Sequence, residues 1–261
     1  MTARLSALVV AHNEEAQLAD CLATLDFANE LVVVLDRCTD GSKAIAERAG
    51  AKLIEGAWEL EGPRRNAGID ACTGDWVLEV DADERVPEAL AQEICARIVD
   101  APYGHFLIPF DNYVGATLVR YGWGGSWGTS ATVRLFAKGP DGPTKRWGDQ
   151  FVHPALELRG QEMWLENRMV HYVDRDISDM LYRLDRYTTA KARDLRASGD
   201  IGTLRGNLRR MVSRMWKCYV ARRGYREGAR GVLIALMAGL YPLLSHLKAR
   251  LEPGPQDAGE D

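Results

Sequence analysis

The chain has 261 residues and a net charge of −4, and 46% of its residues are hydrophobic. This size and composition predict a globular protein with one large domain, or one domain with an appendage, and exclude a mainly disordered chain. The five cysteines are scattered, odd in number and form no Cys-x-x-Cys pair, which argues against a disulfide scaffold and favours reduced cytosolic thiols. The first apolar run is too short for a signal peptide, so secretion is not expected.

Residues 1–100 alternate between strand-like and helix-like segments. We expect strands at 5–11, 31–35, 51–54 and 76–80, and helices at 14–25, 42–49, 66–71 and 87–99. Strands that alternate with helices indicate βαβ units and a mostly parallel sheet.

Residues 101–175 are rich in Gly, Trp, Tyr and Pro, and their strand-like runs at 105–109, 132–136 and 169–173 predict antiparallel additions and long loops. Long loops beside a rigid sheet are common places for substrate sites. From residue 177 the apolar spacing becomes helical. We expect one helix up to the break at Gly199-Asp200, followed by helices at 208–220 and 231–247.

The predicted fold is therefore α/β, with a Rossmann-like, mostly parallel sheet, antiparallel additions and a C-terminal helical extension. The expected boundaries are a catalytic domain at 1–175, with a nucleotide half at 1–100 and an acceptor half at 101–175, a basic helical extension at 176–250 and a disordered tail at 251–261.

Residues 76–84, Trp-Val-Leu-Glu-Val-Asp-Ala-Asp-Glu, are the most informative stretch. A buried strand delivers Asp81 and Asp83 to its carboxyl end, where open α/β sheets bind ligands, and alternation points both carboxylates the same way. Two converging carboxylates can hold a divalent cation, and the cation can hold a diphosphate, which suggests sugar transfer from a nucleotide donor. The alternative is a polar strand end with a capping aspartate.

Other polar residues follow the neighbouring strands. Asn13 and Glu14 come after the first strand, Asp36 comes after the second, and Arg64-Arg65 precede the helix that leads to the Asp81 strand. Because the carboxyl ends of parallel strands one, two and four lie on one rim, we expect these residues to converge.

The order of these motifs resembles glycosyltransferase family 2 with the GT-A fold. The segments that carry the resemblance are Val-Val-Ala-His-Asn-Glu-Glu, Val-Val-Val-Leu-Asp-Arg-Cys-Thr-Asp-Gly-Ser, Arg-Arg-Asn-Ala-Gly and Gly-Asp-Trp-Val-Leu-Glu-Val-Asp-Ala-Asp-Glu. Within the family the chain is most similar to the lipopolysaccharide-core glucosyltransferase-like branch, which shares Arg-Leu-Phe, Val-His and His-Tyr elements, here at 134–136, 152–153 and 171–172. The resemblance covers residues 4–175, and the C-terminal helices resemble the branch more loosely.

The resemblance implies roles on the nucleotide side of the site. Asn13 and Glu14 would meet the nucleotide, and Asp36 would read a uracil-type base. Arg65 would lie near the donor, with Arg64 facing solvent. The alternative for Asp36 is an aspartate that stabilises a turn.

The resemblance also implies a metal site. Asp81 would lie near the ribose, Asp83 would hold Mg²⁺ or Mn²⁺, and His171 would supply a third ligand. The alternative for His171 is a structural histidine.

An inverting transferase needs a carboxylate base to take the proton of the acceptor hydroxyl. Relatives often have an acid directly after the Val-His element, where this chain has Pro154. Asp149, in Arg-Trp-Gly-Asp-Gln-Phe-Val-His, is the candidate base, with Asp111 and Glu157 as alternatives. Asp149 is equally compatible with an ordinary loop aspartate.

Trp123 and Trp127 lie in the aromatic middle of the chain, as does Trp147. Their rings are interpreted as a platform for the sugar acceptor or as packing of the loop region.

Residues 201–250 carry eleven Lys and Arg residues and one acid, Glu227, so this segment has a charge of about +10 and the remainder about −14. The asymmetry suggests an acidic body and a basic extension that faces an anionic partner. The run 231–244 is apolar all round but short and interrupted by Pro242, whereas a spanning helix needs about twenty residues. We therefore expect 205–250 to contact an anionic membrane surface, with a buried helix or an oligomer contact as the alternative.

The sequence thus predicts a glycosyltransferase that moves a hexose from a UDP-sugar to a cell-envelope glycan or lipid-linked acceptor. We expect a cytoplasmic protein, peripheral on the inner face of the membrane. Nucleic acid is not an expected partner, because the basic segment pairs its charges with an apolar run rather than with polar and stacking groups. A nucleotidyltransferase is one alternative, although His12-Asn13-Glu14-Glu15 is not the Gly-rich loop it needs. A catalytically inactive nucleotide-sugar-binding protein is the other.

Overall fold

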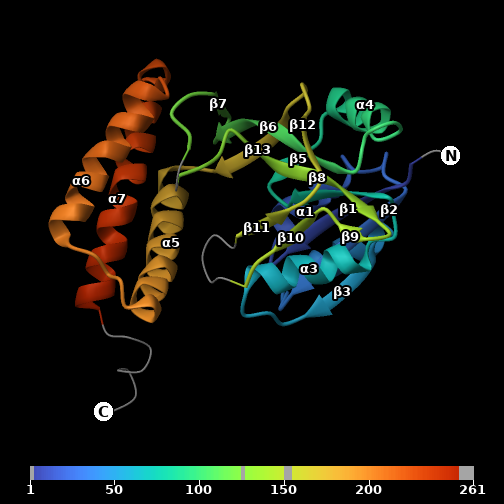
Figure 1. The fold of residues 1–261 in the computed structure, drawn as a ribbon, viewed down its shortest axis with the longest axis horizontal. Coiled ribbons are helices and arrows are strands. Elements are labelled where there is room, and N and C mark those ends of the chain that lie inside the picture. Colours follow the sequence, from blue (N-terminus) through green and yellow to red (C-terminus); the bar gives the residue numbers. More distant parts are fainter. Residues whose placement is uncertain (1–2, 125–126, 150–154, 253–261) are drawn as a thin grey trace, which may run out of the picture. The chain divides into compact units, whose positions relative to one another are not determined.

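The structure is a computed structural model that describes residues 3–124, 127–149 and 155–252 (Figure 1). The chain forms two compact units, which we describe separately. The sheet unit contains residues up to 111 together with 131–172, and the helical unit contains 112–130 together with the chain from 173 onward. Residues 112–130, expected in the acceptor half of the catalytic domain, are thus grouped with the C-terminal helices.

The first part of the sheet unit alternates strands and helices as expected. The elements are β1 (Leu5–Ala11), α1 (Glu15–Leu22), β2 (Glu30–Asp36), α2 (Ser42–Arg48), β3 (Lys52–Gly56), α3 (Glu61–Ala71) and β4 (Trp76–Asp81). The strands pair in the order β3-β2-β1-β4, and all these pairs are parallel. Every residue of β1 is buried, which is why this strand is a continuous apolar run rather than an alternating one.

Mostly antiparallel strands extend this sheet. The additional elements are β5 (Glu84–Arg85), α4 (Glu88–Arg97), β6 (Gly104–Val114), β8 (Ala131–Gly139), β9 (Gly142–Pro143), β12 (Gln161–Trp164) and β13 (Met169–Asp174). From β4 the order continues β8-β6-β13-β5, with β4 and β8 antiparallel, whereas β12 pairs parallel with β6. β10 (Lys145–Trp147) and β11 (Leu156–Leu158) form a separate antiparallel pair. The predicted α/β fold with antiparallel additions is therefore confirmed.

The helical unit is built from three long helices. Its elements are β7 (Thr117–Val119), α5 (Ile177–Ser198), α6 (Leu204–Trp216), a π-helical turn η1 (Lys217–Ala221), a 3₁₀ turn η2 (Gly224–Glu227) and α7 (Ala229–Leu251). α7 packs against both α5 and α6. The core of this unit includes Met180, Leu184, Ile234, Met237 and Tyr241.

Three helices differ from the sequence prediction by four residues or more at one end. α3 begins at Glu61 rather than at residue 66, because Pro63 lies in the first turn, where its missing N–H is not needed. α6 begins at Leu204 rather than at 208, because the Thr203 hydroxyl accepts the N–H of Gly206 at 3.1 Å and caps the helix. α7 continues through Pro242 and ends at Leu251, the first residue of the expected disordered tail, of which residues 253–261 lie outside the described part of the chain.

Because it is not interrupted, α7 has 23 residues and is long and apolar enough to cross a membrane by length and composition. However, 56% of its most apolar window is buried inside the protein. A buried helix in the core of a helical unit can be equally long and apolar, so the length and composition of α7 do not by themselves indicate a membrane span.

Candidate active site

The carboxyl ends of β1, β2 and β4 lie at one edge of the parallel sheet. The register pairs Val10 of β1 with Asp81 of β4. Asn13 follows β1 with a φ of 58°, a left-handed conformation that asparagine tolerates, and its Oδ1 accepts the N–H of Thr39 at 2.8 Å. This hydrogen bond ties the loop after β1 to the loop after β2.

Two more contacts join the same loops. Glu14 precedes α1, and its N–H donates to the hydroxyl of Ser42 at 2.9 Å. His12 Nδ1 lies 2.6 Å from the carbonyl oxygen of Asp36. The structure therefore brings together the residues predicted to follow the first two strands.

Asp36 is buried at the end of β2, with only 2% of its side chain exposed. Its carboxylate accepts hydrogen bonds from Arg37 at 2.9 Å, from Arg64 at 3.1 Å and from the N–H of Trp58 at 3.1 Å. Burial opposes ionisation, but these donors hold the pKa of Asp36 below its usual value. The expectation that Arg64 faces solvent is wrong, because its guanidinium reaches this buried carboxylate.

Asp81 is fixed between two arginines. Arg65 Nη1 donates to Oδ1 at 2.9 Å, and Arg134 Nη2 donates to Oδ2. The N–H of Asp81 donates to Glu84 Oε2 at 2.9 Å. Burial opposes ionisation, yet Arg134 and Arg65 hold the pKa of Asp81 well below its usual range. The carboxylate is therefore kept charged and in one orientation.

A buried network of charged residues around Glu79 holds Arg65, one of the two arginines that bind Asp81. Glu79 comes two residues before Asp81 in β4, so both side chains lie on the same face of the strand. Arg65 therefore contacts both carboxylates, and its Nη1 donates to Glu79 at 2.6 Å. Lys145 Nζ donates to Glu79 at 2.6 Å, and the indole of Trp147 donates at 3.2 Å. Burial alone would raise the pKa of Glu79, but Lys145 and Arg65 lower it to about 2. Burial lowers the pKa of Lys145 to about 8 despite the attraction of Glu79.

The Arg-Arg-Asn-Ala-Gly motif positions this network. Asn66 donates to the carbonyl of Trp147 at 2.8 Å and accepts the N–H of Trp147 at 3.1 Å. Gly68 packs on β1, where an added Cβ would lie 2.5 Å from Leu8 Cδ1. The motif thus holds α3 against β1 and β10, with Arg65 buried behind Asp81.

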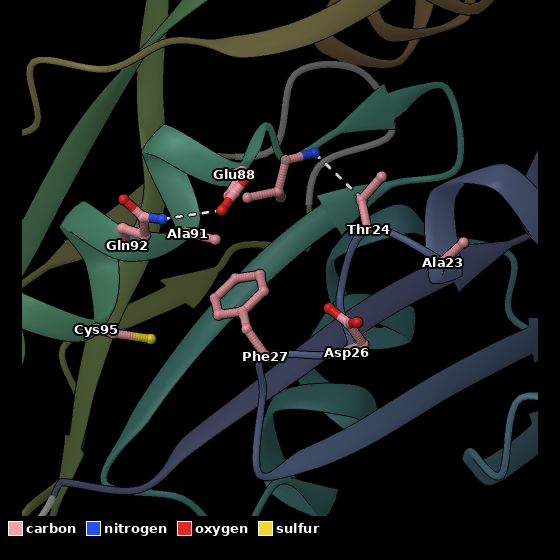
Figure 2. A pocket seen from close by; sticks show the side chains of 9 residues that line it. Ala23, Thr24, Asp26, Phe27, Glu88, Ala91, Gln92 and Cys95 are labelled. Carbon is pink, nitrogen blue, oxygen red and sulfur yellow. Dashed lines mark hydrogen bonds between the residues drawn. The ribbon is translucent and has the colours of Figure 1, made fainter.

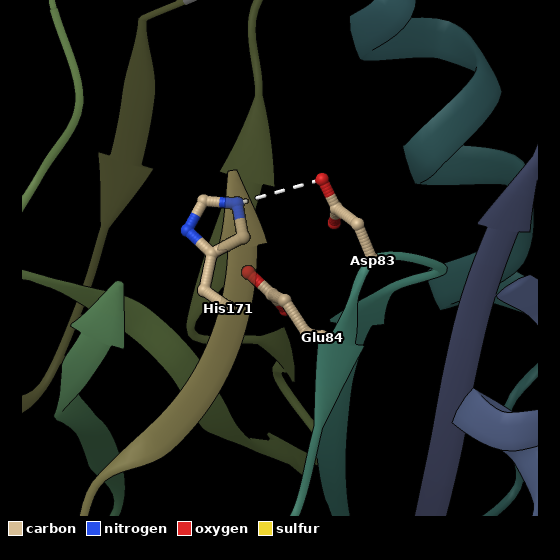
Figure 3. Close-up of side chains that lie close together, drawn as sticks. All are labelled: Asp83, Glu84 and His171. Carbon is tan, nitrogen blue, oxygen red and sulfur yellow. Dashed lines mark ion pairs between the residues drawn. The ribbon is translucent and has the colours of Figure 1, made fainter. Parts of the chain in front are cut away.

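Asp83, Glu84 and His171 form a cluster whose ligand atoms all lie within 4.8 Å of one another (Figure 3). His171 Nε2 is 3.5 Å from Asp83 Oδ2. Strand pairing produces the cluster, because His171 of β13 lies opposite Glu84 of β5 and the N–H of Tyr172 donates to the carbonyl of Asp83 at 2.9 Å. Burial alone would lower the pKa of His171, but the Asp83 carboxylate raises it above its usual value.

Of the three side chains, Glu84 is the least available to bind a cation. It is fully buried, with Oε1 accepting from Arg134 at 2.5 Å and Oε2 accepting the N–H of Asp81. Burial raises the pKa of Glu84 to about 7, against the attraction of Arg134. Asp83 and His171 therefore fit a divalent cation best. A carboxylate with an imidazole suits Mn²⁺ better than Mg²⁺, which prefers oxygen ligands.

The sequence reasoning missed four charged residues of this site: Glu79, Glu84, Arg134 and Lys145. The sequence does contain a signal for Glu79, because this acid interrupts an otherwise apolar strand. A carboxylate buried in such a strand needs a cation as its partner. In the sequence, Arg134 is recognisable only as part of the Arg-Leu-Phe element.

The candidate base remains a prediction. Asp149 is exposed, two residues after β10, and its carboxylate makes no hydrogen bond or ion pair with the described residues. The alternatives are Glu157, which is exposed in β11, and Asp111 in β6, 3.8 Å from Arg168 Nε. The Val-His element at 152–153 and Pro154 lie outside the described residues.

The acceptor-platform prediction is wrong for Trp123 and Trp127. They are 4% and 0% exposed and belong to the core of the helical unit. The indole of Trp123 donates to Val119 at 2.6 Å, and the guanidinium of Arg183 lies 4.1 Å from the Trp127 ring centre. Neither ring has a free face for a sugar, so the packing alternative holds.

A separate hollow of about 430 Å³ lies between the end of α1 and α4 (Figure 2). Its lining includes Phe27, Glu88, Gln92 and Cys95, and none of the predicted site residues. It is therefore distinct from the rim that carries Asp81 and Asp83.

The parallel sheet, its antiparallel additions and the aspartates at the carboxyl end of β4 define a GT-A fold. Residues 6–142 match the glycosyl transferase family 2 profile, more than half of the chain. The protein therefore belongs to glycosyl transferase family 2.

Curated relatives match a shorter segment. An uncharacterized glycosyltransferase of Rickettsia conorii is 33% identical over 95 residues, 36% of this chain and 34% of the relative. The lipopolysaccharide core biosynthesis glycosyltransferase LpsC of Rhizobium meliloti is 31% identical over 93 residues, 34% of each chain. The matched segment thus spans about a third of the length of these relatives. The structure of S. aureus TarS 1-349 in complex with UDP-GlcNAc is similar with a TM-score of 0.50 at 15% identity, covering 72% of this chain and 64% of that one, which shows a shared fold.

Proposed function

We propose that the protein transfers a hexose from a UDP-sugar to a cell-envelope glycan or lipid-linked acceptor, with inversion at the anomeric carbon. The observation that carries the proposal is the Asp83–His171 pair beside Asp81 at the carboxyl end of β4 in a family 2 chain. The similarity to LpsC, which is named for lipopolysaccharide core biosynthesis, supports an acceptor in the cell envelope.

Asp83 and His171 are the residues that would hold Mn²⁺ or Mg²⁺, with Glu84 as a nearby third donor. When bound, the cation would neutralise the charge that develops on the departing nucleoside diphosphate. The pairing of His171 with Glu84, and the hydrogen bond from the N–H of Tyr172 to the carbonyl of Asp83, hold the backbones of His171 and Asp83 side by side before any ligand binds.

The nucleotide would lie along the rim. We assign Asn13 and Glu14 to the loop that contacts it, Asp36 to the base and Asp81 to the ribose. Arg65 acts through Asp81 as a positioning residue, because its guanidinium is buried beneath that carboxylate.

Asp149 is the proposed base. Its exposed carboxylate takes the proton from the acceptor hydroxyl as that oxygen bonds to the anomeric carbon. At the same time the bond from the anomeric carbon to the diphosphate oxygen breaks, and the nucleoside diphosphate leaves with the electron pair.

We also propose that the protein works in the cytoplasm, peripheral on the inner face of the cell membrane. The excess of Lys and Arg in residues 201–250 supports contact with anionic lipid, where a lipid-linked acceptor would be found.

The test is release of UDP from a panel of UDP-hexoses, with Mn²⁺, with Mg²⁺ and with EDTA. The expected result is release that depends on the cation and is lost in Asp83→Asn but kept in Asp100→Asn, a control at an exposed aspartate outside the site. Binding of UDP-sugars with no turnover of any of them would favour an inactive binding protein. Release of pyrophosphate from a nucleoside triphosphate would favour a nucleotidyltransferase.

A further inference from the structure

The helical unit has an exposed apolar groove between α6, η1 and α7. Its volume is about 510 Å³, and its lining is almost entirely apolar. The exposed side chains in it are Val212, Trp216, Tyr219, Val220, Val232 and Leu236, which we call the α6–α7 face. Val212 and Trp216 are the most exposed, at 61% and 64%. Two large apolar side chains exposed side by side on one groove indicate a contact surface.

Helix geometry explains why this face is continuous. An α-helix turns by about 100° per residue, so Leu208, Val212, Met215 and Trp216 fall within an arc of about 100° on α6. Met215, at one edge of the arc, packs against α7, where a Cβ on Gly239 would lie 2.4 Å from its Cγ. At the other edge the arc ends beside the exposed Arg209. The apolar surface of α6 thus extends well beyond its contact with α7.

Exposed cations lie close along the chain to the residues of this face. Arg205, Arg209, Lys217 and Arg223 are exposed, and none of them forms an ion pair with a described residue. Glu227, the one acid in residues 201–250, instead accepts the backbone N–H of Arg120 at 2.9 Å and that of Tyr121 at 3.0 Å. The face therefore combines apolar and aromatic groups with uncompensated positive charge.

We propose that the α6–α7 face docks on an anionic phospholipid surface, with Trp216 and Val212 entering the boundary between headgroups and acyl chains. Aromatic side chains prefer that boundary, and exposed cations are attracted by anionic headgroups. A contact between two copies of this face would bring the same cations together across a two-fold axis, which disfavours self-association. The inference rests on the proposed function only for the choice of the cytoplasmic leaflet.

In this arrangement α7 lies over the membrane and does not cross it. Ile234, Met237, Tyr241 and His246 of α7 are buried in the helical unit. Crossing would separate α7 from α5 and α6 and remove their apolar contacts. Within the expected contact segment 205–250, most of the exposed apolar surface of the groove comes from α6 and η1 rather than from the run 231–244.

The test is flotation of the purified full chain with vesicles of phosphatidylcholine alone and with added phosphatidylglycerol. We expect flotation with the anionic vesicles and a reduction of about tenfold or more in Val212→Ser/Trp216→Ser. Tyr182→Ser, at an aromatic residue of α5 that is 68% exposed and outside the face, is the matched control and should float like the wild type. Thermal unfolding by circular dichroism checks that each variant is folded.

A second variant tests the charges. Arg209→Glu/Lys217→Glu should lose flotation with anionic vesicles while keeping its folded spectrum. Equal flotation of the wild type with neutral and anionic vesicles would overturn the role of the cations. The inference would be overturned in favour of self-association by two results together. The wild type would fail to float with either kind of vesicle, and it would sediment as a dimer that Trp216→Ser dissociates.

Flotation is measured without substrate, so it is independent of turnover. Flotation with no UDP release from any donor would contradict the proposed function alone. UDP release without flotation would contradict the docking inference and the proposed membrane location, and would leave the proposed sugar transfer intact.

Discussion

Removing Lys145 should destabilise the sheet unit, because the buried carboxylate of Glu79 then loses one of its two cationic partners. The two groups are 2.6 Å apart, with side chains 1% and 0% exposed. Breaking a buried ion pair from one side costs about 3–5 kcal/mol. The fall in the pKa of Glu79 from 4.5 to about 2 corresponds to about 3 kcal/mol in favour of its charged form. Glu79 keeps Arg65 and Trp147 as partners, so Lys145→Met should cost about 3 kcal/mol.

Urea unfolding followed by circular dichroism measures this cost. The control is Lys43→Met, which breaks an ion pair with Glu55 at 2.8 Å whose side chains are 49% and 55% exposed. Exposed pairs contribute about 0–1 kcal/mol, so this variant should be close to the wild type. Glu79→Gln/Lys145→Met should recover part of the loss, because no unpaired carboxylate remains. A Lys145→Met variant no less stable than the Lys43→Met control would refute the reasoning.

Three further predictions concern charge and chemistry. Because the pKa of Glu79 is lower in the folded state than its usual 4.5, its stabilisation is present above about pH 4.5 and is lost as the pH falls toward 2. The unfolding free energy of the wild type should therefore fall more steeply in this range than that of Glu79→Gln, and parallel curves from chemical unfolding would contradict the assignment. His171→Gln should weaken Mn²⁺ binding about tenfold or more, measured by electron paramagnetic resonance of free Mn²⁺, and unchanged affinity would exclude His171 as a ligand. Asp149→Asn should abolish sugar transfer while UDP binding by calorimetry stays nearly unchanged, and near-normal turnover would remove Asp149 as the base.

The strands and the rim could be predicted because the signals are local. β1 and β4 are short apolar runs followed by polar residues, and the alternation with helices fixes a parallel arrangement whose carboxyl ends share one edge. The convergence of Asn13, Asp36 and Asp81 then follows from topology alone.

The charge network could not be predicted because its members are distant in the chain. Lys145 reaches Glu79 across 66 positions, and Arg134 reaches Asp81 across 53. Only the pairing of β8 with β4, and the packing of α3 on β10, bring these side chains together. Glu84 was overlooked for a related reason, since its partner strand β13 is far along the sequence.

The errors in the helix bounds and in the roles of the tryptophans have a physical cause as well. Pro242 and the pair Gly62-Pro63 are helix breakers in isolation, but Pro63 lies in a first turn and α7 is held on both sides by packing. The burial of Trp123 and Trp127 depends on α5 and α7, which form their surroundings and follow much later in the sequence.

The most direct test of the central claim is a crystal structure of the protein soaked with UDP and Mn²⁺. The account predicts a metal ion bound by Asp83 and His171, diphosphate oxygens on that ion and the uracil ring near Asp36. Nucleotide bound away from the rim of β1, β2 and β4, or bound at the rim with no metal at Asp83 and His171, would contradict it.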